Sequence, residues 1–499
     1  MDVRFVTEGR GDAVAVMAGE GGQLLPAAQA LDTASGGRLA KALAAARFTG
    51  AAGQAVDIFA PDGLEFARVT VIGLGALDRA DGLAVERWAG NAVKRVLTSG
   101  VEHLVLQPDQ LPNVAKSDAG SRAAFGARMA SYRFDTYRTK LKPEQKPTLK
   151  DVQIAMVDGA VAARARAEKD GPVVDGVFFA RDLVSEPANV LYPDSYAHRI
   201  KSELEPLGVE VEILDAAAME KLGMGALLGV AQGSVREARL VVMNWKGMAS
   251  KKARPMALVG KGVTFDTGGI SIKPAAGMDE MKGDMGGSAA VAGAMKAIAA
   301  RKAKANVVGV VALVENMPGP NAQRPGDIVK TMSGQTIEVL NTDAEGRLIL
   351  ADAVTYVQEK FSPTAVIDLA TLTGAVIVAL GHEYAGFYSN DEDLAHAIEQ
   401  AGTAEGELVW RMPLAAAYDK LIDSPNADMK NIAGKPVAGS IIGAQFIKRF
   451  VKDGVDWAHI DIAGTAWKPG PYEDPLYPAW ATGYGVRLLN RLIANKYEE

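Results

Sequence analysis

Cysteine is absent from this sequence of 499 residues. Its absence excludes disulfides, zinc–thiolate sites, iron–sulfur clusters and cysteine nucleophiles. Histidine is scarce, and no two histidines lie close enough in sequence to form the helical HExxH zinc motif. The five are His103, His198, His382, His396 and His459. Any metal site in this chain must therefore be built mainly from oxygen ligands.

A long uninterrupted apolar run is also missing. The most apolar long stretch, 364–381, contains Asp368, threonines and glycines, and it predicts a buried strand, a turn and further core structure rather than a membrane span. The N-terminal residues show no basic start followed by an apolar stretch, so no secretory signal is expected. These features predict a soluble, cytoplasmic protein without a membrane partner.

Neither sign of charge dominates. The chain has 54 basic and 60 acidic residues, with 48% hydrophobic and 23% charged residues, which is an ordinary globular balance. This composition does not require a nucleic-acid or membrane partner. A length of 499 residues exceeds the usual size of one core, so two domains are expected.

The order of apolar runs predicts an α/β protein with a smaller N-terminal α/β domain. Strands are expected at 67–75 and 101–108, with a helix over 84–100 between them. A polar, basic stretch at 136–150 follows and is typical of a surface connection. An Ala/Arg-rich helix is expected near 159–169. The predicted division is an N-terminal domain over 1–155, a linker helix over 156–180 and a larger second domain over 181–499.

The second domain alternates strands and helices more clearly. This pattern predicts a mostly parallel or mixed central sheet flanked by helices, with several strands buried on both faces. Strands are expected at 210–215, 238–246, 255–262, 306–317, 336–341 and 364–372, and helices at 286–303 and 345–360.

Charged residues are concentrated where two of these strands end. Lys261, Asp266, Lys273 and Asp284 lie among seven glycines in segment 261–287. The shorter segment 341–348 contains Asp343, Glu345 and Arg347. Ligands of open α/β sheets bind at the carboxyl ends of strands, so both segments are expected at one edge of the sheet. In an extended stretch, Asp343 and Glu345 would project from the same side.

The four carboxylates suggest a metal site. As bare anions in a small volume they would raise one another's pKa values, and divalent cations would relieve this repulsion. Two metals a few ångströms apart can hold a bridging water and make it a nucleophile. Lys273 and Arg347 remain as cations able to stabilise an oxyanion.

Simpler interpretations of the same residues remain open. A single Asp or Lys in a loop is usually solvated. Asp343 or Glu345 can serve merely as a cap of the helix that follows. Lys261 and Asp266 can form an ordinary salt bridge. These interpretations do not explain why so many charges gather at two strand ends.

Long motifs in these segments resemble the leucine (cytosol) aminopeptidase family. NTDAEGRL (341–348) resembles the family signature, and KGVTFDTGGISIKP (261–274) resembles its other metal-binding stretch. Further similar motifs lie at 182–193, 315–329, 370–375 and 459–467, so the resemblance spans most of 180–470. The N-terminal part shows only a general similarity to the more variable domain of the family.

The resemblance implies a two-metal aminopeptidase that releases an apolar, leucine-like N-terminal residue. Asp266 and Glu345 would bridge both metals, Asp343 would complete one site, and Lys261 and Asp284 would complete the other. A lysine ligand must be neutral, which two adjacent dications would favour. The metals would be Mn²⁺ or Zn²⁺, although carboxylate-rich sites also accept Mg²⁺ or Co²⁺.

The catalytic roles also follow from the resemblance. Lys273 would stabilise the tetrahedral oxyanion formed when a metal-bridging water attacks the carbonyl, and Arg347 would hold a bicarbonate acting as general base. The pocket for the first side chain would be formed by Met281, Thr371, Gly374 and Ala463. The family further implies a homohexamer that acts on peptides.

Three functions other than that of an aminopeptidase can be compared with the sequence: nucleotide binding, serine hydrolysis and DNA binding. VIGLGALDR (71–79) lacks the third glycine of a dinucleotide-binding turn. Ser271 and Ser288 lack a nucleophile elbow and a paired histidine, which disfavours a serine hydrolase. The alternative is a DNA-binding regulatory protein on the same scaffold, with a basic surface formed by Arg138, Lys140, Lys142, Lys146 and Lys150.

Overall fold

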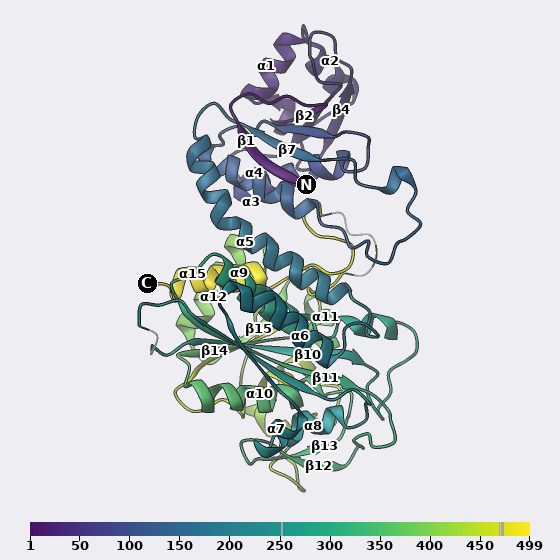
Figure 1. Ribbon diagram of the computed structural model, residues 1–499, viewed down its shortest axis with the longest axis vertical. Coiled ribbons are helices and arrows are strands. Elements are labelled where there is room, and N and C mark those ends of the chain that lie inside the picture. Colours follow the sequence, from purple (N-terminus) through teal and green to yellow (C-terminus); the bar gives the residue numbers. More distant parts are fainter. Residues whose placement is uncertain (251–252, 469, 471–473) are drawn as a thin grey trace. The chain divides into compact units, whose positions relative to one another are not determined.

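The computed structural model describes residues 1–250, 253–468, 470 and 474–499 (Figure 1). The chain divides into two compact units. The first comprises Met1–Val174 and a short segment that ends at Pro478, and the second comprises Asp175–Gly470 and Ala479–Glu499. Helix α5, Ala160–Ser185, contains the last residues of the first unit and the first residues of the second.

The first unit contains one sheet of seven strands between two layers of helices. The strand order is β1-β7-β6-β2-β5-β4, with β3 paired to β2. Its strands are β1 Asp2–Val6, β2 Ala13–Gly19, β3 Gln23–Leu24, β4 Ala55–Phe59, β5 Arg68–Gly73, β6 His103–Leu106 and β7 Asp151–Ala155. Its helices are α1 Pro26–Ala34, α2 Arg38–Ala45, α3 Gly82–Val96 and α4 Lys116–Ala130, with 3₁₀ turns at Glu20–Gly22 and Pro143–Gln145.

The two faces of this sheet bury different side chains because alternate strand residues point to opposite sides. Val14 and Val16 of β2 pack with α1 and α2, whereas Ala15 and Met17 pack with α3 and α4. The glycine turn after β5 has a structural reason: a Cβ on Gly73 would lie 2.3 Å from the carbonyl oxygen of Ala51. This close approach of the backbone explains why glycine stands at this position, so no bound nucleotide is needed to explain it.

The second unit is built on an eight-stranded mixed sheet, here called the main sheet. Its order is β16-β15-β18-β14-β10-β11-β9-β8. The strands are β8 Glu210–Leu214, β9 Arg239–Lys246, β10 Met256–Asp266, β11 Asn306–Asn316, β14 Ala365–Ala370, β15 Ala385–Ser389, β16 Val409–Arg411 and β18 Asp456–Asp461. Strands β18, β14, β10 and β11 are parallel neighbours in the centre of the sheet.

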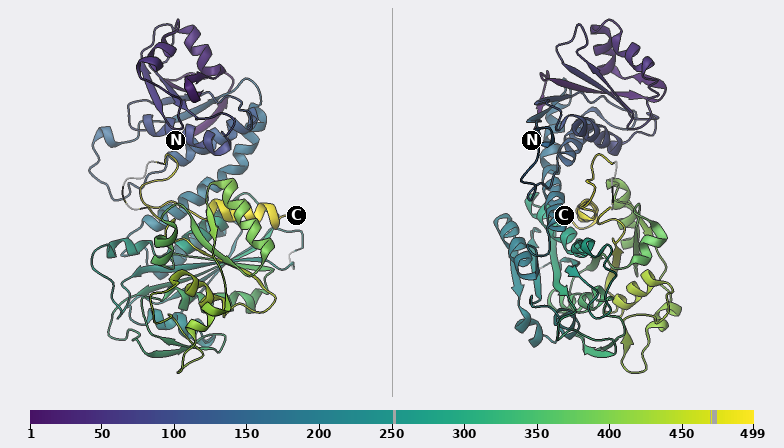
Figure 2. Two further views of the ribbon diagram at one scale, coloured as in Figure 1. Left: turned by 180° about the vertical axis from the view of Figure 1, so that it is seen from behind. Right: turned by 90° about the vertical axis from the view of Figure 1, so that its right-hand side faces the viewer.

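Helices cover both faces of the main sheet (Figure 2). Helices α6 and α9 contact strands on one face, and α8 and α10 contact strands on the other. The helices of this unit are α6 Pro193–Leu204, α7 Ala216–Lys221, α8 Gly225–Ala231, α9 Gly286–Ala300, α10 Gly346–Phe361, α11 Gly374–Leu380, α12 Glu392–Glu405, α13 Ala416–Asp419, α14 Gly439–Lys448 and α15 Val486–Lys496, with 3₁₀ turns at Glu205–Leu207, Met278–Gly283 and Lys420–Ile422.

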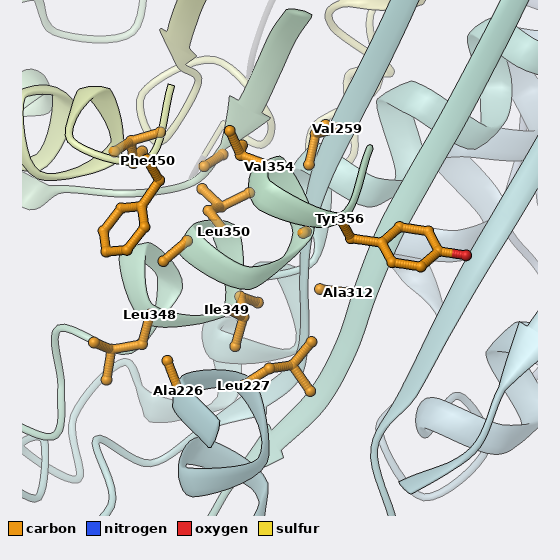
Figure 3. Close-up of a cluster of buried hydrophobic side chains, with 14 of the residues drawn as sticks. Ala226, Leu227, Val259, Ala312, Leu348, Ile349, Leu350, Val354, Tyr356 and Phe450 are labelled. Carbon is orange, nitrogen blue, oxygen red and sulfur yellow. The ribbon is translucent and has the colours of Figure 1, made fainter. Parts of the chain in front are cut away.

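Helix α10 lies in the middle of this layer, and all its residues from Gly346 to Gln358 are buried. Figure 3 shows Leu348 and Ile349 of α10 beside Ala226 and Leu227 of α8, and Val354 close to Val259 of β10. All of these side chains are fully buried. The packing fixes the position of the first turn of α10, which follows directly on Glu345.

Two details differ from the sequence-based expectations. The strand expected at 336–341 is β13, Thr336–Val339, and it belongs to a separate three-stranded sheet with β12, Asp327–Lys330, and β17, Met429–Lys430. A short apolar strand does not by itself specify its partner, so this difference reflects tertiary pairing. The stretch 364–381 forms β14 and α11, but Val378 of α11 is 90% exposed rather than in the core.

Among the described residues, no helix combines the length and apolar character needed to span a membrane.

Candidate metal centre

Four parallel strands of the main sheet bring polar residues to one edge. Strand β10 ends at Asp266, β11 at Asn316 and β18 at Asp461, and Thr371 follows the end of β14. The strand register pairs Asp266 with Asn316 and Ala370 with Asp461. Carboxyl ends of parallel strands meet at the same edge, which explains why residues distant in sequence converge here.

Glycines allow the two charged segments to approach each other. Gly268 and Gly269, just after β10, have φ values of +85° and +64°. A Cβ on Gly268 would lie 2.8 Å from Asp343 Oδ1, and one on Gly346 would lie 2.7 Å from Lys261 Cε. Side chains at these positions would therefore separate the acids from the lysines.

The structure brings all five predicted metal ligands and Lys273 into one cavity of about 350 Å³. Lys261 Nζ lies 2.8 Å from Asp284 Oδ1 and 2.9 Å from Glu345 Oε1. Lys273 Nζ lies 2.7 Å from Asp266 Oδ2 and also contacts Asp343 Oδ1. Oxygen atoms of Asp266, Asp343 and Glu345 all lie within 4.8 Å of one another, a spacing that one metal ion can bridge.

Two of the simpler interpretations do not describe this geometry. Glu345 is the N-cap residue of α10, yet its side chain makes no capping hydrogen bond. The ion-paired partners of Lys261 are Asp284 and Glu345 rather than Asp266. Segment 341–345 is a turn, with Ala344 N donating to Asn341 O, and not the extended stretch that was expected.

Burial dominates the electrostatics of the acids. It raises the pKa of Asp284 well above the ordinary aspartate value, and it also raises the pKa values of Asp266 and Asp343, with the lysines opposing the shift. Burial acts against the charged form of Lys261 and Lys273, but the surrounding carboxylates outweigh it and raise both pKa values. The two lysines thus do not supply enough positive charge to neutralise the carboxylates in this cavity.

The donor set fits divalent metal ions. Four carboxylates against two lysines leave an excess of negative charge in a largely buried cavity. Asp284 Oδ2 and Glu345 Oε2 are buried and make no hydrogen bond with the described residues. Buried carboxylate oxygens without donors are costly unless a cation occupies the space beside them. Oxygen-rich sites of this kind suit Zn²⁺, Mn²⁺, Mg²⁺ or Co²⁺.

Asparagines that the sequence reasoning did not single out support these ligands. Asn316 Nδ2 donates to Asp266 Oδ1 at 2.8 Å and to Thr342 O at 3.0 Å, joining the two charged segments. Asn431 Oδ1 accepts from Leu340 N at 2.8 Å, and its Nδ2 donates to Asn341 O at 2.6 Å. The position of Asn316 at the end of an apolar strand was the only available sequence signal.

The same cavity contains the predicted pocket residues. Its lining includes Met281, Thr371, Gly374 and Ala463, and it extends to Ile377 and Trp467. Trp467 stacks on Trp480, with ring centroids 5.7 Å apart. The cavity therefore has charged side chains at one end and an apolar wall beside them.

Arg347 lies apart from this cavity lining. It lines a separate cavity of about 320 Å³ together with loop residues 432–437 and with Gly439 and Ile442 of α14. Its guanidinium is buried and donates from Nη1 to Asn431 O at 2.7 Å, whereas Nε has no partner among the described residues. Burial lowers the pKa of Arg347 to about 10, although the carboxylates of Glu345 and Asp461 oppose the shift.

Comparisons with known proteins agree with this geometry. A family model described as "Cytosol aminopeptidase family, catalytic domain" matches residues 178–490, and one described as the N-terminal domain of the same family matches residues 13–141. The chain belongs to the cytosol aminopeptidase family. The match covers both structural units, whereas the sequence motifs had pointed mainly to the second.

Relatives extend over nearly the whole chain. A "Probable cytosol aminopeptidase" of Caulobacter vibrioides is 58% identical over 486 residues, covering 97% of each chain. One of a Bradyrhizobium species is 53% identical, covering 94% of this chain and 93% of the relative.

Solved structures are similar over the same extent. A mutant of tomato leucine aminopeptidase has a TM-score of 0.89 and 33% identity, covering 99% of this chain and 97% of its own. The bottromycin maturation enzyme BotP in complex with Mn has a TM-score of 0.84 and 31% identity, covering 97% and 99%.

Membership of the cytosol aminopeptidase family makes this protein a metal-dependent aminopeptidase, a hydrolase of peptides. The predicted family, the two-domain α/β fold and the enzyme class are thereby confirmed. The assignment of individual residues to metal, catalytic and pocket roles stays a prediction, and so do the domain boundaries at 155 and 181.

Proposed function

We propose that this enzyme removes an apolar, leucine-like residue from the free N-terminus of peptides with two divalent metal ions, Mn²⁺ or Zn²⁺. The observation that carries the proposal is the cavity that joins four carboxylates, three of them buried, and two lysines to an apolar wall. The structure of the related BotP in complex with Mn supports manganese as one candidate.

Five residues would hold the metals. Lys261, Asp266, Asp284, Asp343 and Glu345 line the cavity together. When bound, the two cations would supply Lewis acidity for the substrate amine and carbonyl and lower the pKa of a bridging water. The positive charge of such cations would also reverse the electrostatic effect that now raises the pKa of Lys261, so that its neutral amine can serve as a ligand.

Lys273 is proposed to stabilise the oxyanion of the tetrahedral intermediate. Its side chain is 20% exposed, whereas that of Lys261 is 3% exposed, so Lys273 is the more accessible of the two cavity lysines. A fixed cation beside a developing negative charge in a partly dry cavity lowers the barrier more than it would in water. Asp266 and Asp343 orient its ammonium group from two sides.

The orphaned Nε of buried Arg347 supports an anion site, and bicarbonate is the proposed occupant. Bicarbonate would supply a proton acceptor. The role of Arg347 itself is to bind and orient this anion, since a guanidinium binds planar oxyanions through two parallel hydrogen bonds. Asn431, whose carbonyl oxygen accepts from Nη1, holds the guanidinium plane in place.

Substrate selection is proposed to depend on the apolar part of the cavity. Met281, Thr371, Gly374 and Ala463 would surround the first side chain. Gly374 leaves open space, because no heavy atom lies within 4 Å of a Cβ built there. We further propose a cytoplasmic location, for which the names of the relatives are the support, and a homohexameric assembly as in the family.

A DNA-binding function is not proposed. Part of the positive charge at 136–150 is already neutralised, because Arg138 lies 3.5 Å from Asp135 and Lys150 lies 2.6 Å from Glu102. The relatives that match this chain are described as aminopeptidases.

The test is release of leucine from a leucyl anilide. Activity should disappear with a chelator and return with Mn²⁺ or Zn²⁺. An N-acetylated leucyl anilide should not be cleaved, because its blocked nitrogen cannot bind a metal. Cleavage of the acetylated substrate, or full activity after exhaustive chelation, would contradict the proposal.

A further inference from the structure

Asp461, the last residue of β18, accepts hydrogen bonds from two neighbouring segments of the chain that line the substrate cavity. Its Oδ1 accepts from Leu372 N at 3.0 Å and from Ala463 N at 3.3 Å. Its Oδ2 accepts from Thr373 Oγ1 at 2.6 Å. Leu372, Thr373 and Ala463 all line the cavity, whereas Asp461 does not.

A second contact ties Asp461 to helix α14. Ser440 Oγ, in the first turn of α14, donates to Asp461 Oδ2 at 3.3 Å and accepts from Tyr388 OH at 2.7 Å. Asp461, Ser440 and Tyr388 are all buried. A buried carboxylate with four donors is satisfied and holds its donors in one geometry, because hydrogen bonds to an ionised acceptor are about twice as strong as neutral ones.

The wall held by Asp461 also contacts the metal centre. Thr371, immediately before Leu372, accepts from Lys261 Nζ at 2.8 Å through its carbonyl oxygen. Its Oγ1 donates to Asp284 Oδ1 at 2.8 Å. A shift of the 371–374 backbone would therefore move both a pocket wall and the partners of two metal ligands.

We infer that Asp461 is a positioning residue that sets the distance between the 371–374 wall and the 463 wall, and thereby the preference for the first side chain. This inference rests on the proposed function, because it assumes that the cavity takes that side chain. Asp461 acts through the backbone of its neighbours and does not touch the substrate. Its position at a strand end, in register with Ala370, makes it a fixed point of the main sheet rather than part of a loop.

The experiment compares kcat/KM for leucyl and alanyl anilides in the wild type and in Asp461→Ala and Asp461→Asn. The ratio of the two values reports pocket fit and is unaffected by the fraction of folded enzyme. Asp461→Ala should lower the leucyl/alanyl ratio by about tenfold or more, since a poorly fitted methylene is worth about 10- to 200-fold. Asp461→Asn keeps the shape of the side chain and one acceptor oxygen, so it should lower the leucyl/alanyl ratio by less. If the alanine variant does not fold, the asparagine variant alone tests whether Asp461 sets this preference.

The matched control is Asp368→Asn. Asp368 is equally buried on the neighbouring strand β14, where it accepts from Trp457 Nε1 at 2.8 Å and pairs with His459. Unlike the partners of Asp461, these two partners do not line the cavity. This variant should lose stability and keep the wild-type ratio.

The outcomes test the proposed pocket and the role of Asp461 separately. A wild type that does not prefer the leucyl substrate would overturn the proposed pocket and this inference with it. A wild type that prefers leucine, with the same ratio in both Asp461 variants, would overturn the inference alone. An equal change of ratio in Asp368→Asn would also overturn it, because the effect would then be general destabilisation.

Discussion

Asn316 donates from its side-chain amide to Asp266 at 2.8 Å, so two neighbouring strand ends hold one carboxylate of the candidate metal centre in a fixed orientation. The same amide donates to Thr342 O, beside Asp343. Replacing a residue that orients a metal ligand typically costs about 10- to 100-fold in metal affinity or activity. Asn316 is therefore one of the contacts that join the two charged segments of the sequence into one site.

Replacing this amide should weaken metal binding. Asn316→Leu keeps the approximate volume but removes both donors, leaving Asp266 free to rotate. Metal affinity should fall about 10- to 100-fold, measured by activity against free metal concentration in a metal buffer. Asn306→Leu is the matched control, because Asn306 lies at the opposite end of the same strand and bonds Ser250 O and Ala253 O. Equal affinity loss in both variants would contradict the role of Asn316.

Removing a proposed bridging ligand should have a larger effect. Glu345→Gln preserves side-chain shape, but it removes a negative charge that pairs with Lys261 at 2.9 Å. The purified variant should retain its fold by circular dichroism and lose most of its bound metal by elemental analysis. A variant that binds two metals per chain as tightly as the wild type would show that Glu345 is not a ligand.

The proposed catalytic lysine predicts a different pattern. Lys273→Ala should keep its metals and lose about 10²–10³-fold in kcat, the usual cost of removing one oxyanion donor. Lys296→Ala, which removes a lysine ion-paired with Glu203 at 2.7 Å away from the cavity lining, should leave kcat unchanged. Full activity of the Lys273 variant would exclude its assigned role.

Local patterns were sufficient to predict the strands and helices that carry the metal centre. Apolar runs at 255–262, 306–317 and 364–372 became β10, β11 and β14, because strands buried on both faces need apolar side chains throughout. The convergence of Asp266 with Glu345 was predicted from their positions after strands. The interpretation of 336–341 as part of the main sheet was wrong, and Glu345 reaches the cavity through a turn and the packing of α10 instead.

Roles that depend on tertiary contacts could not be predicted. Most groups that Asn316, Asn431 and Asp461 contact lie 21 to 91 positions away in sequence, and single polar residues give no periodic signal. Arg347 was predicted beside the carboxylates, yet its guanidinium faces a second cavity. Which way a side chain leaves the first turn of a helix depends on its neighbours, here Asn431 and Gly443.

A buried carboxyl group outside the active site predicts how stability changes with pH. Glu407 is buried, and its Oε2 accepts from Leu488 N at 2.8 Å and Gly485 N at 3.0 Å at the start of α15. Burial raises its pKa from 4.5 to about 7, with the charge of Arg487 opposing the shift.

Between pH 4.5 and 7, Glu407 therefore binds more protons in the folded protein than in the unfolded chain. Its contribution to folding stability is fully present below pH 4.5 and is lost as the pH rises through 7. The contribution of Glu407 to the free energy of unfolding changes by on the order of 3 kcal/mol, because each pKa unit corresponds to about 1.4 kcal/mol. Asp352, with a pKa raised by burial to about 7, contributes in the same direction, so the effect of Glu407 must be isolated by difference. Glu407→Gln cannot ionise, and urea unfolding at pH 5, 6, 7 and 8 should show a smaller loss of stability with rising pH than in the wild type. Parallel pH dependence in the two proteins would mean that Glu407 titrates near its ordinary value in the folded state.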